Sequence, residues 1–231
     1  MTSIGKRKAA EAALAEIKDG QVIGIGTGST VAILIELLGE RISREGLEVL
    51  GVPTSYQSAY LASASSIRLT TLDEHPSLDL AIDGADEVDE SLNLIKGGGA
   101  ALTKEKVVDT ASKRFVVIAD ASKRVKELGA KMPVPIEVLP FARRTVEKSI
   151  GILGGDPKLR DGGDRKDGPL VTDNGNFIID AQFGAIKDAR ALEFELKRIP
   201  GIVEVGLFVN LADAAYFGNE VGVCTLERKR K

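Results

Sequence analysis

The chain has 231 residues, 43% of them hydrophobic and 28% charged, which suits a soluble globular enzyme with one large domain and room for a smaller one. Its 31 Lys and Arg residues stand against 34 Asp and Glu residues, a formal net charge of −3, so charge gives no argument for binding nucleic acid or an anionic membrane. The apolar runs are of strand length, far below the roughly 20 residues of a membrane span.

The scarcity of cysteine and histidine narrows the chemistry further. Cys224 is the single cysteine, which excludes an internal disulfide and fits a reducing compartment. The N-terminal pattern is charged and alanine-rich without a secretory apolar core, so a cytoplasmic protein is predicted. The single histidine, His75, lies before Pro76 in a turn-like stretch. A zinc site of the usual His/Cys kind therefore lacks ligands, and a His-based triad is available only if His75 is its base.

The first 125 residues or so alternate between helical and strand patterns. The predicted helices are residues 3–18, 31–42, 56–65 and 100–112. The predicted strands are residues 21–26, 47–52, 78–82 and 114–119, with a short extended segment at 93–96. Because the last of these strands (RFVVIA) is almost wholly apolar, it should be covered on both faces. The alternation predicts an α/β fold with an open, mostly parallel, Rossmann-like sheet and helices on both faces.

The pattern changes after Gly129. Prolines bracket a strand-like PIEVL at 135–139, which predicts an edge or boundary strand. A helix at 141–150 and a charged, loop-rich stretch at 154–168 follow, and Asn174-Gly175 between two apolar runs predicts a hairpin. The remaining predicted elements are a helix at 187–198, a strand at 203–208 and a last strand at 221–226, in which Cys224 should be a small core residue.

This order of elements predicts the domain organisation. Strand, helix, hairpin, helix and strand in succession form an α+β (ferredoxin-like) unit. We therefore expect an inserted smaller domain at 131–206, and a catalytic α/β domain made of residues 1–130 and 207–231. The charged stretch at 154–168 lies far in sequence from the segments discussed next, so it is expected to affect assembly or solubility.

Four segments follow predicted strands, at the edge where open α/β sheets bind ligands. They are residues 26–30 (GTGST), 83–86 (DGAD), 96–99 (KGGG) and 119–123 (ADASK). In the first, glycines let backbone N–H groups approach a phosphate or sugar oxygen, and the following helix N-terminus favours negative charge. It is neither a Walker loop nor a dinucleotide fingerprint, since Val31 stands where the third glycine should be. A tight turn without a ligand is an equal alternative.

The second segment places Asp83 and Asp86 three residues apart at a strand end. Such carboxylates could bind a divalent cation, supply acid and base groups, or cap the next element. Their spacing does not fit an EF-hand loop.

The third segment joins Lys96 to three glycines, whose entropic cost suggests that a close approach or an unusual dihedral requires them. Glu105 follows in the first turns of a helix, where it could face the same cleft as Lys96 or simply interact with the helix dipole. Lys96, Glu105, Asp83 and Asp86 together suit proton abstraction beside a carbonyl. The carboxylate removes the proton and the lysine stabilises the enediolate oxygen, so no metal or other cofactor is required.

In this order and at these separations, the segments resemble the ribose-5-phosphate isomerase A family. The resemblance runs through IGIGTGST at 23–30, AIDGADEVD at 81–89, IKGGGAALTKEK at 95–106, VIADASK at 117–123 and PGIVEVGLF at 200–208. It implies a metal-independent interconversion of ribose 5-phosphate and ribulose 5-phosphate, in the non-oxidative pentose phosphate pathway. It also implies a small-molecule sugar phosphate as partner, and assembly as a homodimer or homotetramer.

The resemblance further implies roles for individual residues. Glu105 is the base that moves a proton between C1 and C2, Lys96 stabilises the enediolate, and Asp83 and Asp86 serve ring opening and hydroxyl protons. The implied substrate-binding residues are Thr27, Gly28, Ser29, Thr30, Asp83, Gly84, Ala85, Asp86, Lys96, Gly97, Gly98, Gly99, Lys123 and, more loosely matched, Lys6.

Other classes of protein fit parts of this pattern. An amino-sugar phosphate deaminase or a coenzyme A transferase shares the sheet, and architecture alone does not decide function. The pairing of Lys96 with Glu105 favours the isomerase. A non-catalytic sugar-phosphate sensor would carry a helix-turn-helix domain, for which a sheet beginning by residue 21 leaves no room.

Overall fold

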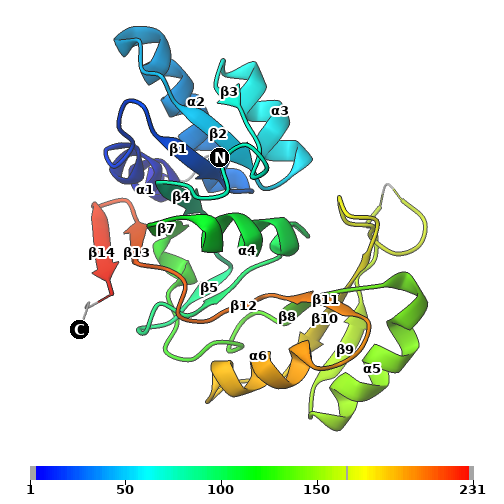
Figure 1. Ribbon diagram of the computed structural model, residues 1–231. Coiled ribbons are helices and arrows are strands. Elements are labelled where there is room, and N and C mark those ends of the chain that lie inside the picture. The colour runs from blue at the N-terminus through cyan, green and yellow to red at the C-terminus, as the bar shows by residue number, and fades with distance from the viewer. Residues whose placement is uncertain (1–3, 165, 229–231) are drawn as a thin grey trace. The chain divides into compact units, whose positions relative to one another are not determined.

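The computed structural model describes residues 4–164 and 166–228, which fall into two compact units (Figure 1). Unit 1 comprises the described residues of Met1–Ala85, Lys104–Arg124 and Leu211–Lys231, and unit 2 comprises Asp86–Thr103 and Val125–Asn210. This grouping differs from the predicted domains chiefly in assigning Asp86–Thr103 to the second unit. The domain boundaries at 130/131 and 206/207 stay a prediction.

Unit 1 is built on a seven-stranded sheet in the order β14-β13-β7-β4-β1-β2-β3. Every pairing is parallel except that of β13 with β14, which confirms the predicted open, mostly parallel sheet. Its strands are β1 (Val22–Ile25), β2 (Leu50–Pro53), β3 (Arg68–Leu69), β4 (Leu80–Asp83), β7 (Phe115–Asp120), β13 (Ala214–Gly218) and β14 (Val223–Glu227). The helices that accompany it are α1 (Ile4–Leu14), α2 (Ser29–Glu45), α3 (Tyr56–Ala64), α4 (Leu102–Ala111) and the short η1 (Ala121–Lys123).

Helices cover both faces of this sheet, as strand β1 shows. Ile23 and Ile25 pack in the core cluster that holds residues of α1 and α2. The alternate residue Gly24 faces the other way, where a Cβ would lie 2.5 Å from the side chain of Val108 on α4. Successive residues of a strand point to opposite faces, so α1 and α2 lie on one face and α4 on the other.

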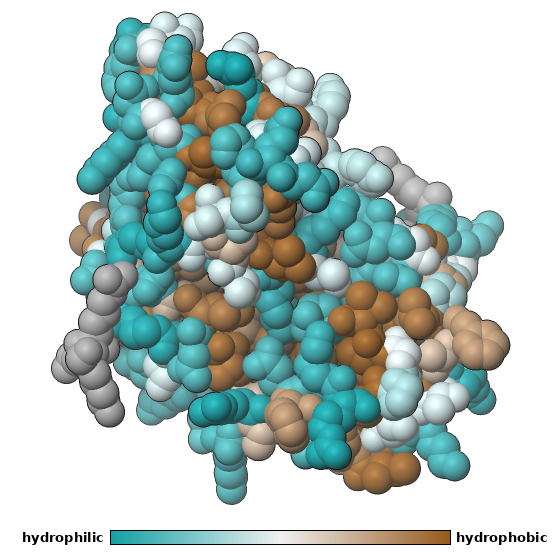
Figure 2. Space-filling model, viewed as in Figure 1, coloured by the Kyte–Doolittle hydropathy of each residue, from teal (hydrophilic) through white to brown (hydrophobic). Residues whose placement is uncertain are grey.

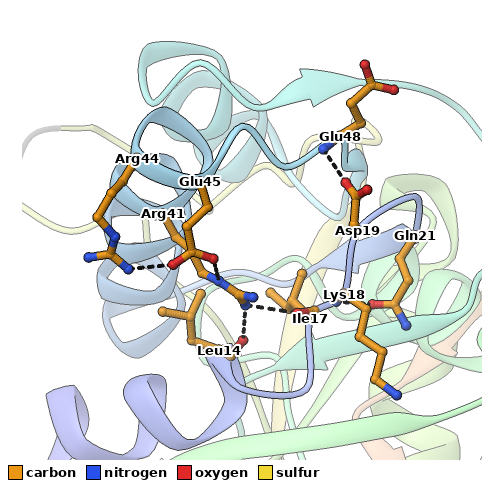
Figure 3. Close-up of polar contacts among 9 residues, drawn as sticks. All are labelled: Leu14, Ile17, Lys18, Asp19, Gln21, Arg41, Arg44, Glu45 and Glu48. Atoms are coloured by element: carbon orange, nitrogen blue, oxygen red, sulfur yellow. Dashed lines mark hydrogen bonds and ion pairs between the residues drawn. The ribbon is translucent and has the colours of Figure 1, made fainter.

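Helix α1 is fixed at both of its ends. At its start, Gly5 touches Gly218 of β13 so closely that a Cβ on Gly218 would lie 1.9 Å from the Gly5 carbonyl oxygen. At its end, Nη1 of Arg41 on α2 donates to the carbonyl oxygens of Leu14 at 3.0 Å and Ile17 at 2.9 Å (Figure 3). Leu14 is the last residue of α1, and its carbonyl also accepts from the N–H of Ile17 at 3.2 Å, so the guanidinium adds to the bonds at this helix end and ties it to α2.

Unit 2 contains a four-stranded antiparallel sheet in the order β11-β8-β10-β9. Along the chain its elements run β8-α5-β9-β10-α6-β11, the arrangement of a ferredoxin-like fold, which confirms the predicted α+β unit. A three-stranded sheet, β12-β6-β5, completes the unit. The elements are β5 (Glu87–Val88), β6 (Leu94–Ile95), β8 (Val134–Val138), η2 (Pro140–Ala142), α5 (Arg143–Ile152), β9 (Asp156–Leu159), β10 (Phe177–Gln182), α6 (Ala189–Lys197), β11 (Ile202–Val205) and β12 (Leu207–Phe208).

Two local expectations were wrong. Strand β8 is interior, so the edge alternative was wrong, whereas Pro135 does lie at a boundary, just past the end of the pairing with β11. The last pair between β11 and β8 is Val205 with Ile136, and the Pro135 carbonyl accepts from the N–H of Gly206 beyond that pair. The missing donor of Pro135 therefore removes no ladder bond to β11. Cys224 lies in β14, an edge strand, where it is exposed rather than part of the core.

Among the residues that the structure describes, no helix is both long and apolar enough to cross a bilayer.

Candidate functional site

In unit 1 the candidate site begins where β1 and β4 end side by side. Asp83, the last residue of β4, is 0% exposed, and its Oδ1 accepts from the N–H groups of Thr27 at 3.0 Å and Gly84 at 2.6 Å. A Cβ on Gly26 would lie 2.0 Å from the same oxygen. Glycine at position 26 thus lets the carboxylate reach the backbone after β1, which explains why this loop begins with glycine.

The hydroxyl of Thr27 joins this loop to the end of β2. It lies 2.8 Å from the hydroxyl of Thr54 and donates to that of Ser55 at 2.7 Å. The N–H of Gly28 donates to Oε1 of Gln57 at 3.3 Å. None of Thr54, Ser55 and Gln57 was predicted, although a Thr-Ser pair one residue after a predicted strand is a signal that could have found them.

Lys6 and Ser29 lie together at the start of α2. Nζ of Lys6 on α1 donates to Oγ of Ser29 at 2.8 Å. Thr30 follows in the first turn of α2, and Gly28 is the residue before the helix. A helix N-terminus, two hydroxyls and an ammonium are a suitable set of partners for a phosphate.

Glu105 lies in the first turn of α4, as predicted, and its side chain is buried, with the residue only 5% exposed. A carboxylate is rarely buried unless its surroundings compensate the lost hydration, so such groups concentrate at structural networks and functional sites.

Lys123 lies in η1, directly after β7, and is half-buried. Because β7 pairs in parallel with β4, with Val117 opposite Asp83, this lysine follows the same edge of the sheet as the Asp83 segment.

In unit 2, Asp86 is held by the glycine run that follows β6. The N–H of Gly98 donates to Oδ2 of Asp86 at 2.7 Å, and a Cβ on Gly98 would lie 2.8 Å from Oδ1. Gly97 has φ of 107°, a conformation that glycine adopts without strain. The close approach and the unusual dihedral predicted for this run are both present.

Lys96 is 2% exposed, and its Nζ lies over the ring of Phe208, 5.4 Å from the centroid. Its backbone N–H donates to the carbonyl of Gly206 at 2.9 Å. An ammonium placed over an aromatic face is stabilised electrostatically in a site that is poor in water.

The implied residues therefore fall into two groups, each assembled within its own unit. Unit 1 brings together the ends of β1 and β4 with the start of α1, and unit 2 brings together Asp86 and the glycine run. The first group is Lys6, Thr27, Gly28, Ser29, Thr30, Asp83 and Gly84, and the second is Asp86, Lys96, Gly97, Gly98 and Gly99. Ala85, Lys123 and Glu105 belong to unit 1 as well.

These groups are suited to proton transfer. Unit 1 supplies the carboxylates of Asp83 and Glu105, and unit 2 supplies the carboxylate of Asp86 and the buried ammonium of Lys96. Within residues 4–164 and 166–228, no cluster of three or more His, Cys, Asp or Glu side chains is arranged to hold a metal ion.

Known proteins resemble the chain over nearly its whole length. The family described as "Ribose 5-phosphate isomerase A (phosphoriboisomerase A)" matches residues 50–222. A protein of Methanosarcina acetivorans named ribose-5-phosphate isomerase A is 53% identical over 226 residues, covering 98% of this chain and 95% of the relative. A protein of the same name from Pyrococcus abyssi is 52% identical over 96% of this chain and 97% of its own length.

Solved structures agree with these relatives. The structure of ribose 5-phosphate isomerase A from Methanocaldococcus jannaschii superposes with a TM-score of 0.92 at 51% identity, covering 96% of this chain and 97% of that one. A D-ribose-5-phosphate isomerase in complex with phospho-erythronic acid superposes with a TM-score of 0.94 at 49% identity, with the same coverage. Identity near half over almost the full length leaves one conclusion: this chain belongs to the ribose 5-phosphate isomerase A family.

Proposed function

We propose that this chain interconverts D-ribose 5-phosphate and D-ribulose 5-phosphate, as an aldose–ketose isomerase of the non-oxidative pentose phosphate pathway. Its family membership over nearly the whole chain carries this proposal. The buried ammonium and carboxylates supply the proton-transfer groups that such a reaction needs. The solved relative in complex with phospho-erythronic acid binds a phosphorylated compound, which supports a sugar phosphate as the ligand class.

In the proposed mechanism, Glu105 removes the proton from C2 of the open-chain aldose and returns it to C1. The electron pair passes to the carbonyl oxygen, and the Lys96 ammonium stabilises the enediolate that results. Asp83 and Asp86 carry hydroxyl protons and assist ring opening. Because Glu105 and Lys96 are both buried, charges that develop near them are screened weakly, which strengthens their effect.

The phosphate is proposed to bind at the start of α2. Lys6, Ser29 and Thr30 supply an ammonium and two hydroxyls beside a helix N-terminus, and Lys123 supplies a second ammonium. The family resemblance supports further substrate-binding residues, which are Gly28, Gly84 and Ala85 in unit 1 and Gly97, Gly98 and Gly99 in unit 2.

No cofactor or metal is proposed, because the ammonium of Lys96 can stabilise the enediolate in place of an ion. A cytoplasmic location is proposed as well, and it is supported by Cys224, a free thiol that suits a reducing compartment.

A homodimer or homotetramer is proposed from the family resemblance. Apolar side chains also lie at the surface of unit 2, over the part that carries α5 (Figure 2). The exposed large apolar residues described in this unit are Leu139, Phe141, Ile152, Leu153, Val171 and Phe194. Exposed apolar groups of this kind commonly mark contact surfaces. Light scattering of the purified protein at several concentrations tests the assembly.

The function is tested by assaying purified protein for conversion of ribose 5-phosphate, and then by Glu105→Gln. General base catalysis contributes about 10²–10⁴ in rate, so this change should lower kcat by a similar factor while KM stays within about threefold. Asp109→Asn is the matched control, since it removes a buried carboxylate one turn further along α4. A Glu105→Gln enzyme retaining more than about a tenth of kcat, only about 1.4 kcal/mol of barrier, would exclude Glu105 as the base. Ammonia release from an amino-sugar phosphate, or coenzyme A transfer, would point to the other enzymes that share the sheet.

A further inference from the structure

Arg160 touches the glycine run from a distant part of the chain. Its Nη1 donates to the carbonyl oxygen of Gly97 at 2.9 Å and to that of Gly98 at 3.1 Å. The arginine follows β9, in the charged stretch that was expected to affect assembly or solubility, and it lies 63 residues after Gly97. All three residues belong to unit 2.

The guanidinium is held from behind by Asp180 on β10. Nε donates to Oδ2 at 2.8 Å and Nη2 donates to Oδ1 at 2.5 Å, so the pair is bidentate, and the Arg160 side chain is only 16% exposed. The Arg160 backbone is fixed as well, since its N–H donates to Ile178 and its carbonyl accepts from Leu170. A planar guanidinium held by a carboxylate along its Nε and Nη2 side presents Nη1 in a fixed direction.

The geometry of the peptide links Arg160 to Asp86. In a trans peptide the carbonyl and the N–H of one unit point in opposite directions. Because both carbonyls face Arg160, the N–H groups of Gly98 and Gly99 point away from it. That of Gly98 reaches Oδ2 of Asp86 at 2.7 Å. Arg160 therefore binds the carbonyl of the Gly97–Gly98 peptide unit, and Asp86 binds its N–H. Each of these charged groups polarises the peptide and strengthens the hydrogen bond made by the other.

The contacts of Arg160 and Asp86 restrict the backbone freedom of the three glycines. Three consecutive glycines can adopt many backbone conformations, so the run has no intrinsic reason to present its N–H groups to one side. Arg160 removes that freedom by fixing two successive carbonyls.

We propose that Arg160, locked by Asp180, is a positioning residue that orients the peptide units of the glycine run and thereby places the carboxylate of Asp86 for reaction. The inference rests on the proposed function, in which Asp86 carries hydroxyl protons. Arg160 and Asp180 both come from the ferredoxin-like part of the chain. Under this proposal, that part supports catalysis by positioning Asp86.

The experiment compares Arg160→Met with Arg143→Met in the full-length enzyme. Arg143 is a matched control because it lies in the same unit and also pairs with a carboxylate, Glu147 at 3.0 Å, within α5. Arg160→Met should lower kcat at least about tenfold more than Arg143→Met does, and KM should change less than kcat. Arg160→Lys should restore little, because an ammonium cannot reproduce the fork.

Asp180→Asn supplies a second variant that keeps the arginine. It should lower kcat in the same direction by a smaller factor, and amide hydrogen exchange in a peptide covering residues 96–100 should become faster in it. Equal kcat values for Arg160→Met and Arg143→Met, or unchanged exchange and kcat in Asp180→Asn, would overturn the inference. If the unmodified enzyme fails to convert ribose 5-phosphate, the proposed function fails instead, so the two failures are distinguishable.

Discussion

Oγ1 of Thr103 donates a hydrogen bond to Oε2 of Glu137 at 2.5 Å in unit 2. Glu137 is 0% exposed, and its other oxygen accepts from the side chains of Thr172 at 2.8 Å, Asn174 at 3.0 Å and Asn176 at 2.8 Å. Four donors compensate the burial of this carboxylate. Thr103 lies in the first turn of α4, two residues before Glu105, so the network also anchors the helix that carries the proposed base.

Thr103→Val should therefore reduce both stability and turnover. Loss of one donor to a buried carboxylate costs roughly 1–3 kcal/mol of unfolding free energy, and the freed helix start should lower kcat by several-fold or more. Thr172→Val is the matched control, because it removes one hydroxyl donor from the same carboxylate without touching α4. Urea unfolding and steady-state kinetics measure the two effects. Equal kcat values in the two variants would show that the network supports the fold alone.

Lys6→Met should weaken phosphate binding. Removing the ammonium that contacts Ser29 should raise KM for ribose 5-phosphate by about tenfold or more, since charge-assisted hydrogen bonds to anions contribute roughly 1.5–3 kcal/mol. Lys8→Met removes a charge from the same helix, where Nζ donates instead to the Glu220 carbonyl at 2.7 Å, and should leave KM nearly unchanged. Competition by inorganic phosphate provides a second readout. A similar KM in both variants would argue against Lys6 as a phosphate ligand.

An ion pair in unit 1 should make stability depend on pH. Burial raises the pKa of Glu16, but hydrogen bonds from Arg114 and Tyr216 outweigh it and hold that pKa below its usual 4.5. A carboxyl with a lowered folded-state pKa stabilises the fold above its unfolded pKa, and this contribution is lost as pH falls through the folded value. Arg114→Met should thus destabilise the protein near pH 7 and flatten the loss of stability below pH 4.5.

Urea unfolding between about pH 3 and pH 7 measures this slope. Arg68→Met, which removes an exposed arginine of the same unit, should keep the slope of the unmodified protein. An unchanged slope in Arg114→Met would mean that other carboxylates dominate acid unfolding.

Removal of divalent ions should leave activity intact. Incubation with excess EDTA followed by assay in chelated buffer should give the kcat of untreated enzyme, because the proposed mechanism assigns enediolate stabilisation to the Lys96 ammonium. Activity that disappears with the chelator and returns with a divalent ion would contradict that assignment.

Much of the fold could be predicted because its signals are local. The first five residues of strand β7 (Phe115–Asp120) are buried, as the apolar sequence of this segment predicts. Strand β13 was missed because AAYFG combines alanines and glycine, which favour strands weakly, with burial that comes from neighbours distant in sequence. The edge assignment of Pro135 was wrong for a related reason. Whether a missing N–H matters depends on where the neighbouring strand ends, which periodicity does not reveal.

The residues of the candidate site also separate into those with a local sequence signal and those without one. The strand-end segments carrying Asp83, Asp86 and Lys96 were visible because each is a run of small and charged residues after a strand. Ser55 and Arg160 were not, because their importance depends on pairings between strands: β2 beside β1, and β9 beside β10. Such contacts are properties of the sheet order and not of any one segment.

The contact between Gly5 and Gly218 also has a consequence for how the enzyme matures. The helix that carries Lys6 is synthesised before the strand against which it rests, which is complete only after residue 218 has been added. Strands β1 and β4 can form much earlier. The proposed phosphate site would therefore be among the last parts of unit 1 to form. A ribosome-bound chain stopped before residue 214 should lack this site, although Asp83 and Glu105 have already been synthesised.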